Sequence, residues 1–297
     1  MMKYSVKKYI CLILLIFVSS ILSAQSKHEF SISLGGGLSG INAETTNLLD
    51  VKTNNKFGMN FGLGYAYNFS ESFALLSGLE ADMNMVNFKS NDVSGDYVVM
   101  DREGHWFRFV YDSRNYQEDL SYTYLKVPLM LRYKHAVGDN WGIYAAAGPK
   151  VGINLRSKYD NSIQSLNTKG AYALWGQEDD IPEINDLELE GFGSFPNAAS
   201  NGSVELKPMV SLSAEVGIQL SISNQMGLYI GGYLDHALNN VEKQSRKHFI
   251  EYDQKRTFPI HMNSVSHSQF MKVDTNSMLS KIKPFQAGLK VSVYFGL

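Results

Sequence analysis

Cysteine is almost absent from this chain. The single cysteine, Cys11, lies near the start of an apolar N-terminal run and not at its end, where a lipoprotein attachment cysteine would lie. The chain after that run therefore can form no disulfide and no thiolate metal site. A protein that crosses an oxidising periplasm unfolded benefits, because it carries no thiols that can mispair.

Long apolar runs and positive charge are also scarce. After residue 24 no run approaches the about 20 apolar residues of a helical membrane span, which excludes a helical membrane protein. The formal net charge is −2, and removal of residues 1–24, which hold Lys3, Lys7 and Lys8 and no acid, makes it −5. This charge argues against a nucleic-acid partner.

The N-terminus has the pattern of a secretory signal peptide. Its three lysines precede an apolar run over residues 9–18, and small residues then lead to Ala24 and Gln25. The run is too short to span a bilayer comfortably, although an uncleaved anchor is the alternative. We expect cleavage near Ala24/Gln25, with residues 1–24 as signal peptide and residues 25–297 as one barrel domain.

The rest of the chain shows two-residue periodicity. Over residues 57–69 every odd position is large and apolar, and every even position is Gly, Asn or Ala. A strand sorts these two sets onto separate faces and a helix does not. The alternation predicts eight strands, over residues 29–40, 57–69, 73–87, 122–134, 141–156, 204–222, 226–235 and 284–297.

Charge indicates which strand face is the interior. The charged residues share the small, glycine-rich face, whereas the other face is almost purely aliphatic and aromatic. Eight strands enclose only enough volume for side chains to fill, so the apolar face is expected to point to lipid and the charges to pair inside. The charged residues expected in the lumen are Glu80, Asp82, Lys126, Arg132, Lys150, Arg156, Glu215 and Lys290.

Connection lengths alternate strictly. Residues 41–55, 88–121, 157–203 and 236–283 form long connections, and residues 70–72, 136–140 and 223–225 form short ones. Outer-membrane barrels have short periplasmic turns and long external loops. The sequence therefore predicts an all-β, eight-stranded antiparallel up-and-down transmembrane barrel with both termini in the periplasm. An aromatic girdle is expected at that end, from Phe30, Tyr67, Phe69, Phe73, Tyr133, Trp141 and Phe295.

Three segments resemble the PorT-like outer-membrane barrels of Bacteroidetes. They are YLKVPLMLRY at residues 124–133, SLGGGL at residues 33–38 and GPKVG at residues 148–152. The resemblance covers the whole mature chain and implies an eight-stranded outer-membrane barrel, with involvement in protein secretion for the founding member. A fold alone does not carry that role over. The chain departs from the pattern by ending in Leu297 and not in an aromatic residue, so Phe295 is expected to serve in the assembly signal.

Prolines and glycines within the strands need separate interpretation. Pro128, Pro149 and Pro208 lie inside predicted strands, where proline cannot donate to the ladder, so bulges or distorted pairing are expected. Gly35, Gly37 and Gly40 have the spacing of a dinucleotide-binding motif but open no helix, which favours ordinary strand glycines.

Candidate metal and cofactor sites are weak. The acidic run over residues 177–190 lacks the spaced oxygens and turn glycine of a calcium loop, so a solvated loop is favoured. The histidines show no metal-pair spacing, and we predict no metal and no cofactor. A basic, histidine-rich segment is expected to pair with the acidic run or to face lipopolysaccharide. It contains Lys243, Arg246, Lys247, His248, Lys255, Arg256, His261 and His267.

A rim enzyme is the alternative that single residues leave open. His236 beside Asp235, at the outer end of a predicted strand, is the best candidate pair for a hydrolase or acyltransferase. No local motif accompanies the pair, which favours a solvated rim histidine. Its candidate neighbours are Tyr233, His248, Glu251 and Asp253.

The prediction for function is a non-enzymatic outer-membrane barrel with a plugged lumen and a structural, binding or envelope role. A small passive porin and a soluble ligand-carrying barrel are further alternatives to the rim enzyme. Expected partners are outer-membrane lipid and lipopolysaccharide, the barrel assembly machinery during biogenesis, and an envelope or secretion protein.

Overall fold

The computed structural model describes residues 27–45, 51–172, 183–184, 187–223, 225–243, 247–269 and 278–296. The expected signal peptide and its cleavage position lie outside these residues. Within the described part of the chain, no helix is long and apolar enough to cross a membrane.

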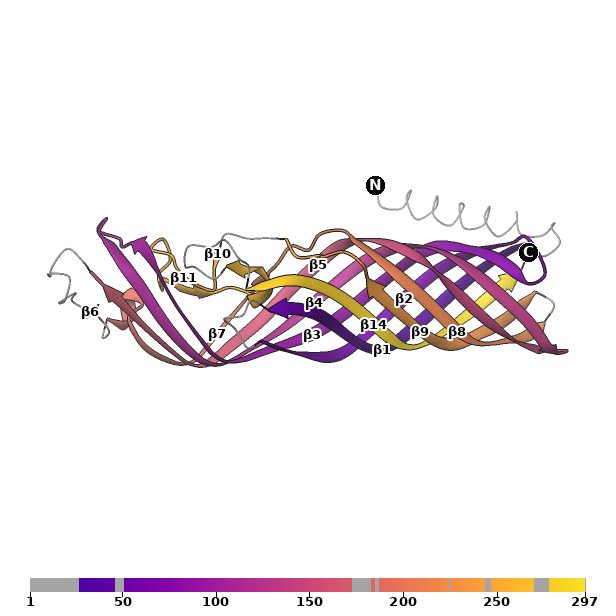
Figure 1. Ribbon diagram of the computed structural model, residues 1–297, viewed down its shortest axis with the longest axis horizontal. Helices are drawn as coiled ribbons and strands as arrows, with labels where there is room; N and C mark the ends of the chain where they lie inside the picture. Colours follow the sequence, from indigo (N-terminus) through magenta and orange to yellow (C-terminus); the bar gives the residue numbers. More distant parts are fainter. Residues whose placement is uncertain are drawn as a thin grey trace, which may run out of the picture.

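Eight strands of the main sheet close into an antiparallel ring, drawn as tilted ribbons in Figure 1. In ring order they are β1 (His28–Thr45), β2 (Lys52–Asn68), β3 (Phe73–Met100), β4 (Trp106–Gly138), β5 (Trp141–Ala171), β8 (Met209–Ser223), β9 (Met226–Ala237) and β14 (Leu279–Gly296). Pairing of β14 with β1, from Glu29↔Gly296 onward, closes the ring. Closure satisfies the backbone polar groups, as lipid requires. The predicted all-β, eight-stranded fold is confirmed.

The barrel wall sorts its side chains as the alternation predicted. On β2, Phe57 and Leu63 are 60% and 51% exposed on the outer face, whereas Asn60 is 1% exposed in the lumen. Rings of the expected girdle contact one another beside a short turn, with centroid distances of 6.2 Å for Phe69–Phe73 and 5.2 Å for Phe73–Tyr133.

Pro128 interrupts strand pairing without changing its register. The β4–β5 pairs pass from Pro128↔Lys150 to Leu131↔Ala147, and the β3–β4 pairs pass from Ser77↔Leu129 to Glu80↔Lys126. By this register Gly78 lies opposite Pro128, and its φ of +153° suits glycine. The expected distortion is therefore a gap in pairing and not a bulge.

The long connections 88–121 and 157–203 were predicted as loops, and this is wrong for most of their length. Strands β3, β4 and β5 have 28, 33 and 31 residues, far more than the about 9 to 11 that a membrane-spanning strand needs. They run on past the barrel at the end away from the C-terminus (Figure 1), where β7 (Gly193–Ser203) and β6 (Glu183–Ile184) pair with β5. We call this sheet the extension.

The extension has its own hydrophobic core. The segment 247–269, with β10 (Lys247–His248), β11 (Ile250–Tyr252), β12 (Ile260–Met262), η3 (Val265–His267) and β13 (Ser268–Gln269), packs on its inner face, and η2 (Glu188–Glu190) precedes β7. The Phe249 ring lies 4.9 Å from that of Tyr116, and Tyr252 lies 5.1 Å from Phe107. These four side chains are at most 5% exposed.

The strand predicted over residues 204–222 begins later than expected. Pro208 lacks the N–H that a ladder needs, and β8 begins at Met209. Before it, the Lys207 N–H donates to the Val241 carbonyl at 2.8 Å, and Leu206 forms an isolated bridge with Glu242. This stretch therefore leads from the extension back to the barrel.

Candidate functional site

Four carboxyl groups and three ammonium groups occupy the middle of the lumen. Lys150 Nζ lies 2.6 Å from Glu80 Oε1. Lys290 Nζ lies 3.0 Å from Glu80 Oε2 and 2.8 Å from Glu215 Oε1. These side chains come from β3, β5, β8 and β14, and they meet because each occupies an inward-facing position of its strand.

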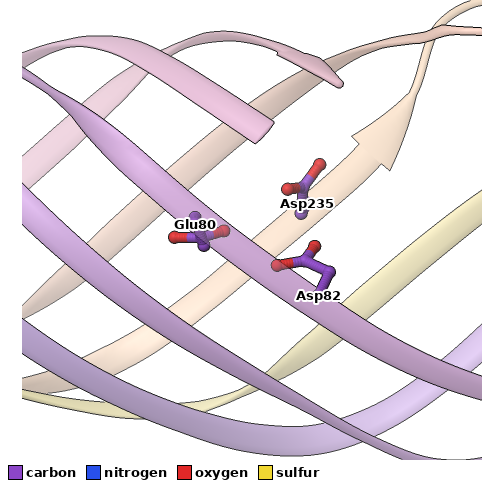
Figure 2. A group of neighbouring side chains, drawn as sticks. All are labelled: Glu80, Asp82 and Asp235. Carbon is purple, nitrogen blue, oxygen red and sulfur yellow. The ribbon is translucent and has the colours of Figure 1, made fainter. Parts of the chain in front are cut away.

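A second part of the cluster surrounds Lys126. Its Nζ donates to Asp235 Oδ2 at 2.9 Å and forms an ion pair with Asp82, and Lys150 Nζ lies 3.4 Å from the same Asp235 oxygen. Figure 2 shows Glu80, Asp82 and Asp235 converging, and their ligand oxygens lie within 4.8 Å of one another. Three carboxylates at this spacing can hold a metal ion. Here two ammonium groups supply the positive charge, so the arrangement is a salt-bridge network.

A separate ion pair closes the lumen toward the end where β1 begins and β14 ends. Arg132 Nη1 and Nη2 each donate to a Glu29 carboxylate oxygen at 2.7 Å, a bidentate geometry. The guanidinium also lies 4.5 Å from the centre of the Tyr229 ring, and the Tyr229 hydroxyl donates to Glu29 at 3.3 Å. Glu29 was not among the charged residues predicted in the lumen, although its alternation with Ser31 and Ser33 marks the lumen face.

The space between these two layers is small. A cavity of about 70 Å³ lies there, lined by Glu80, Arg132, Tyr144, Glu215, Tyr229 and Lys290 among others. A water molecule needs about 10–15 Å³ in this measure, so the cavity has room for a few waters. The lumen is therefore filled by side chains at both layers.

Seven of the eight charged residues predicted in the lumen lie there, and Arg156 does not. The β4–β5 register shifts between Thr123↔Arg156 and Tyr124↔Asn154, so β5 has one extra residue at this point. Such a bulge reverses which residues of a strand face inward. Arg156 is exposed on the outer wall, and Ser157 takes the inward position.

The candidate enzyme pair does not form. Asp235 is 3% exposed inside the lumen, bound to Lys126 and Lys150, whereas His236 is the next residue of the same strand and faces outward. Tyr233 faces the lumen, and the other three candidate neighbours lie in segment 247–269, which packs on the extension. There His248 stacks on Tyr97, Glu251 accepts from Asn263, and Asp253 pairs with Arg256.

The acidic run over residues 177–190 and the basic, histidine-rich segment were expected to pair with each other, but their described residues mostly form other contacts. Much of the acidic run, and Arg246, lie outside the described residues. Glu190 lies 3.7 Å from Arg102, which belongs to the β3–β4 hairpin and not to the basic segment. Lys243 pairs with Glu205, and Arg256 pairs with Asp253 within its own segment.

A buried carboxyl group fastens segment 247–269 to the extension. Glu118 on β4 accepts from Ser264 Oγ at 2.6 Å, from the Val265 N–H at 3.0 Å and from the Tyr116 hydroxyl. Burial raises the pKa of Glu118 to about 7, although these hydrogen bonds favour its ionised form. No pattern in the sequence marks Glu118, because its partners come from a segment about 146 positions away.

The closed antiparallel ring, the apolar outer face and the charged lumen define an outer-membrane β-barrel protein. Residues 23–242 match the family described as outer membrane protein beta-barrel domain, and the chain belongs to this family. None of the curated proteins matches the chain.

Several solved outer-membrane proteins are similar in fold. Neisserial surface protein A is 8% identical with a TM-score of 0.35, covering 93% of this chain and 100% of its own. Ail of Yersinia pestis is 12% identical with a TM-score of 0.31, and the match covers 91% of this chain and 99% of the Ail chain. OprG of Pseudomonas aeruginosa is 11% identical with a TM-score of 0.32, covering 92% and 99%. Likeness this distant carries no information about function.

Proposed function

We propose that this protein is a non-conducting, non-enzymatic outer-membrane barrel that displays the extension outside the cell as a binding surface for an envelope protein. The observation that carries the proposal is a lumen filled by paired charges beneath an extension with its own hydrophobic core. A barrel of this kind holds a folded sheet at the cell surface and gives solutes no path through the wall.

The structure of the lumen supports a role as a membrane anchor for the extension, and it argues against a passive porin. Eight strands leave no aqueous channel, and the Glu80–Lys150 and Glu29–Arg132 layers fill the interior at two heights. The positions of Asp235 and His236 support a binding role over a rim enzyme, since a base needs its orienting group within hydrogen-bond reach.

The finer assignment is to the PorT-like barrels of Bacteroidetes, and it rests on the segment YLKVPLMLRY. In this assignment a signal peptide cleaved near Ala24/Gln25 directs export, and the barrel assembly machinery inserts the chain. The partner is then an envelope or secretion protein that meets the extension, and nucleic acid has no part.

Planar-bilayer recording of the purified full-length protein tests the plugged lumen. We expect no steady conductance, because the ion pairs leave no continuous water path. The double variant Lys290→Ala, Glu215→Ala removes one complete pair and keeps Lys150 with Glu80, so brief openings are expected from it. Steady, porin-sized conductance of the unaltered protein would contradict the proposal.

A further inference from the structure

A notch of about 610 Å³ opens in the barrel wall where β5 separates from β8. Pairing of β5 with β8 ends at Gly152↔Met209, and pairing with β7 begins at Lys158↔Ser203. Residues 153–157 of β5 stay paired with β4 on one side, but on the other side they face residues 204–208 without a regular ladder. The notch is a built feature of the wall, because Pro208 and the β5 bulge both interrupt the sheet here.

Basic side chains line this notch. They are Arg156, Lys158, Lys207 and Lys243, with Glu205 as the acid among them. Lys243 and Glu205 pair with each other. Within the described part of the chain, the side chains of Arg156, Lys158 and Lys207 form no ion pair. The notch therefore presents three positive charges without a bound counter-charge.

The bulge in β5 places these charges directly beside an apolar strip. Val151, Ile153 and Leu155 are 55%, 54% and 56% exposed on the outer wall. Arg156 follows at once on the same outer side, and Lys158 two residues later, since alternate residues of a strand share a face. A single strand thus passes from an apolar surface to a cationic one within three residues.

The height of the notch in the membrane follows from its backbone. Irregular backbone that faces lipid does not occur within the hydrocarbon layer, because its polar groups would be unsatisfied there. The apolar strip belongs in that layer, so the notch lies at its edge, in the headgroup layer. This edge is on the side of the long connections, which in outer-membrane barrels is the outer side.

We propose that the notch binds the phosphate groups of lipid A, the anchor of lipopolysaccharide. Arg156 offers a planar fork that suits a phosphate group, and Lys158 and Lys207 add point charges. The strip from Val151 to Leu155 accommodates the acyl chains of the same molecule. A free phosphate would use the cations alone, whereas lipid A uses both surfaces. The inference rests on the outer-membrane location and not on whether the lumen conducts.

Binding of lipid A to the detergent-solubilised full-length protein tests the proposal. The triple variant Arg156→Gln, Lys158→Gln, Lys207→Gln is expected to bind lipid A about tenfold or more weakly, since three charge-assisted contacts are removed. The unaltered protein is expected to bind chemically dephosphorylated lipid A more weakly than intact lipid A, by a similar factor. The difference between protein and variant should shrink at high salt, which screens exposed charges.

A second triple variant controls for loss of positive charge as such. Arg108 and Arg114 are exposed cations of the extension, and Lys255 is an exposed cation of segment 247–269; their replacement by Gln should leave lipid A binding unchanged. Equal weakening by both triple variants, or none by the first, would overturn the proposal. Inorganic phosphate binding as tightly as lipid A would also overturn it, because the apolar strip would then contribute nothing. Gel mobility of unboiled samples checks that each variant forms the barrel.

Discussion

At the level of single side chains, the central cluster of the lumen contains one more carboxyl group than ammonium groups. Glu80, Asp82, Asp235 and Glu215 face Lys126, Lys150 and Lys290. Lys150 is 2% exposed and contacts two of the four acids, whereas Asp82 shares Lys126 with Asp235. Removing a base and removing an acid should therefore have opposite consequences for charge balance.

Lys150→Met is expected to destabilise the barrel by about 3–5 kcal/mol, because it leaves four buried carboxyl groups with two ammonium groups. Asp82→Asn makes the numbers equal and is expected to be close to neutral. The measurement is the temperature at which the fast-migrating band of an unboiled sample is lost on a denaturing gel. Equal losses in the two variants would show that charge balance does not control this cluster.

At the level of strands, the barrel could be predicted because lipid outside and charge inside impose alternation on every strand. The residues of β2 show it without interruption from Phe57 to Asn68. The alternation wrongly predicted that Arg156 faces the lumen, because a bulge depends on the pairing partner and has no local sequence signal. The two-residue alternation correctly predicted most of the charged residues of the lumen cluster. Its partners across the barrel did not, because they lie on strands that are distant in sequence.

The strands of the extension were not predicted, for a different physical reason. In the barrel part of β4 the apolar side chains face outward, as Val127 and Leu131 do, whereas in the extension they face inward, as Tyr116 and Phe109 do. One strand thus reverses its apolar face as it leaves lipid for water. Asn115, with φ of +55°, marks a second change: the inward-facing residues of β4 have odd numbers before it, in the extension, and even numbers after it, toward the barrel. Two reversals within one strand obscure a period-two pattern.

Glu118 should make the docking of segment 247–269 sensitive to pH. Its pKa is about 7 in the folded protein against 4.5 for the free group, so the folded state holds the proton more tightly. Its contribution is fully present below pH 4.5 and is lost as the pH rises through 7, on the order of 3 kcal/mol in all. Glu118→Gln should remove this dependence, because an amide stays neutral: its oxygen can still accept from the Val265 N–H, and its NH2 group can donate to Ser264 Oγ.

Thermal unfolding of the extension at pH 5.5 and pH 8, followed by near-ultraviolet circular dichroism of its aromatic core, checks the Glu118 prediction. Asp119→Asn is the matched control, since Asp119 is the next residue and pairs with Lys56 at the surface. The control should keep most of the pH response of the unaltered protein, because the charge of Asp119 contributes least among the causes that shift the pKa of Glu118. A Glu118→Gln protein with the same pH response as the control would disprove the assignment.

At the level of the whole molecule, the barrel and the extension form one elongated body built on three shared strands (Figure 1). Because β3, β4 and β5 continue from one part into the other, the extension is held in a fixed direction away from the membrane. Large apolar side chains remain exposed on it, with Val98 63% and Trp106 58% exposed at the β3–β4 hairpin. Because these two side chains lie at one hairpin outside the lipid belt, they give a protein partner an apolar contact point.

A photo-crosslinking residue in place of Trp106 is therefore expected to form a discrete adduct with one envelope protein in intact cells. Trp141 is the matched control, because it is 46% exposed and lies in the girdle at the opposite end of the barrel. The same replacement there should react with lipid and give no discrete protein adduct. The adduct at Trp106 should also weaken when Val98 is changed to a charged residue, since the two side chains lie in the same hairpin. Identical adduct patterns at the two positions, or an adduct at Trp106 only with a second copy of this chain, would rule out the proposed partner surface.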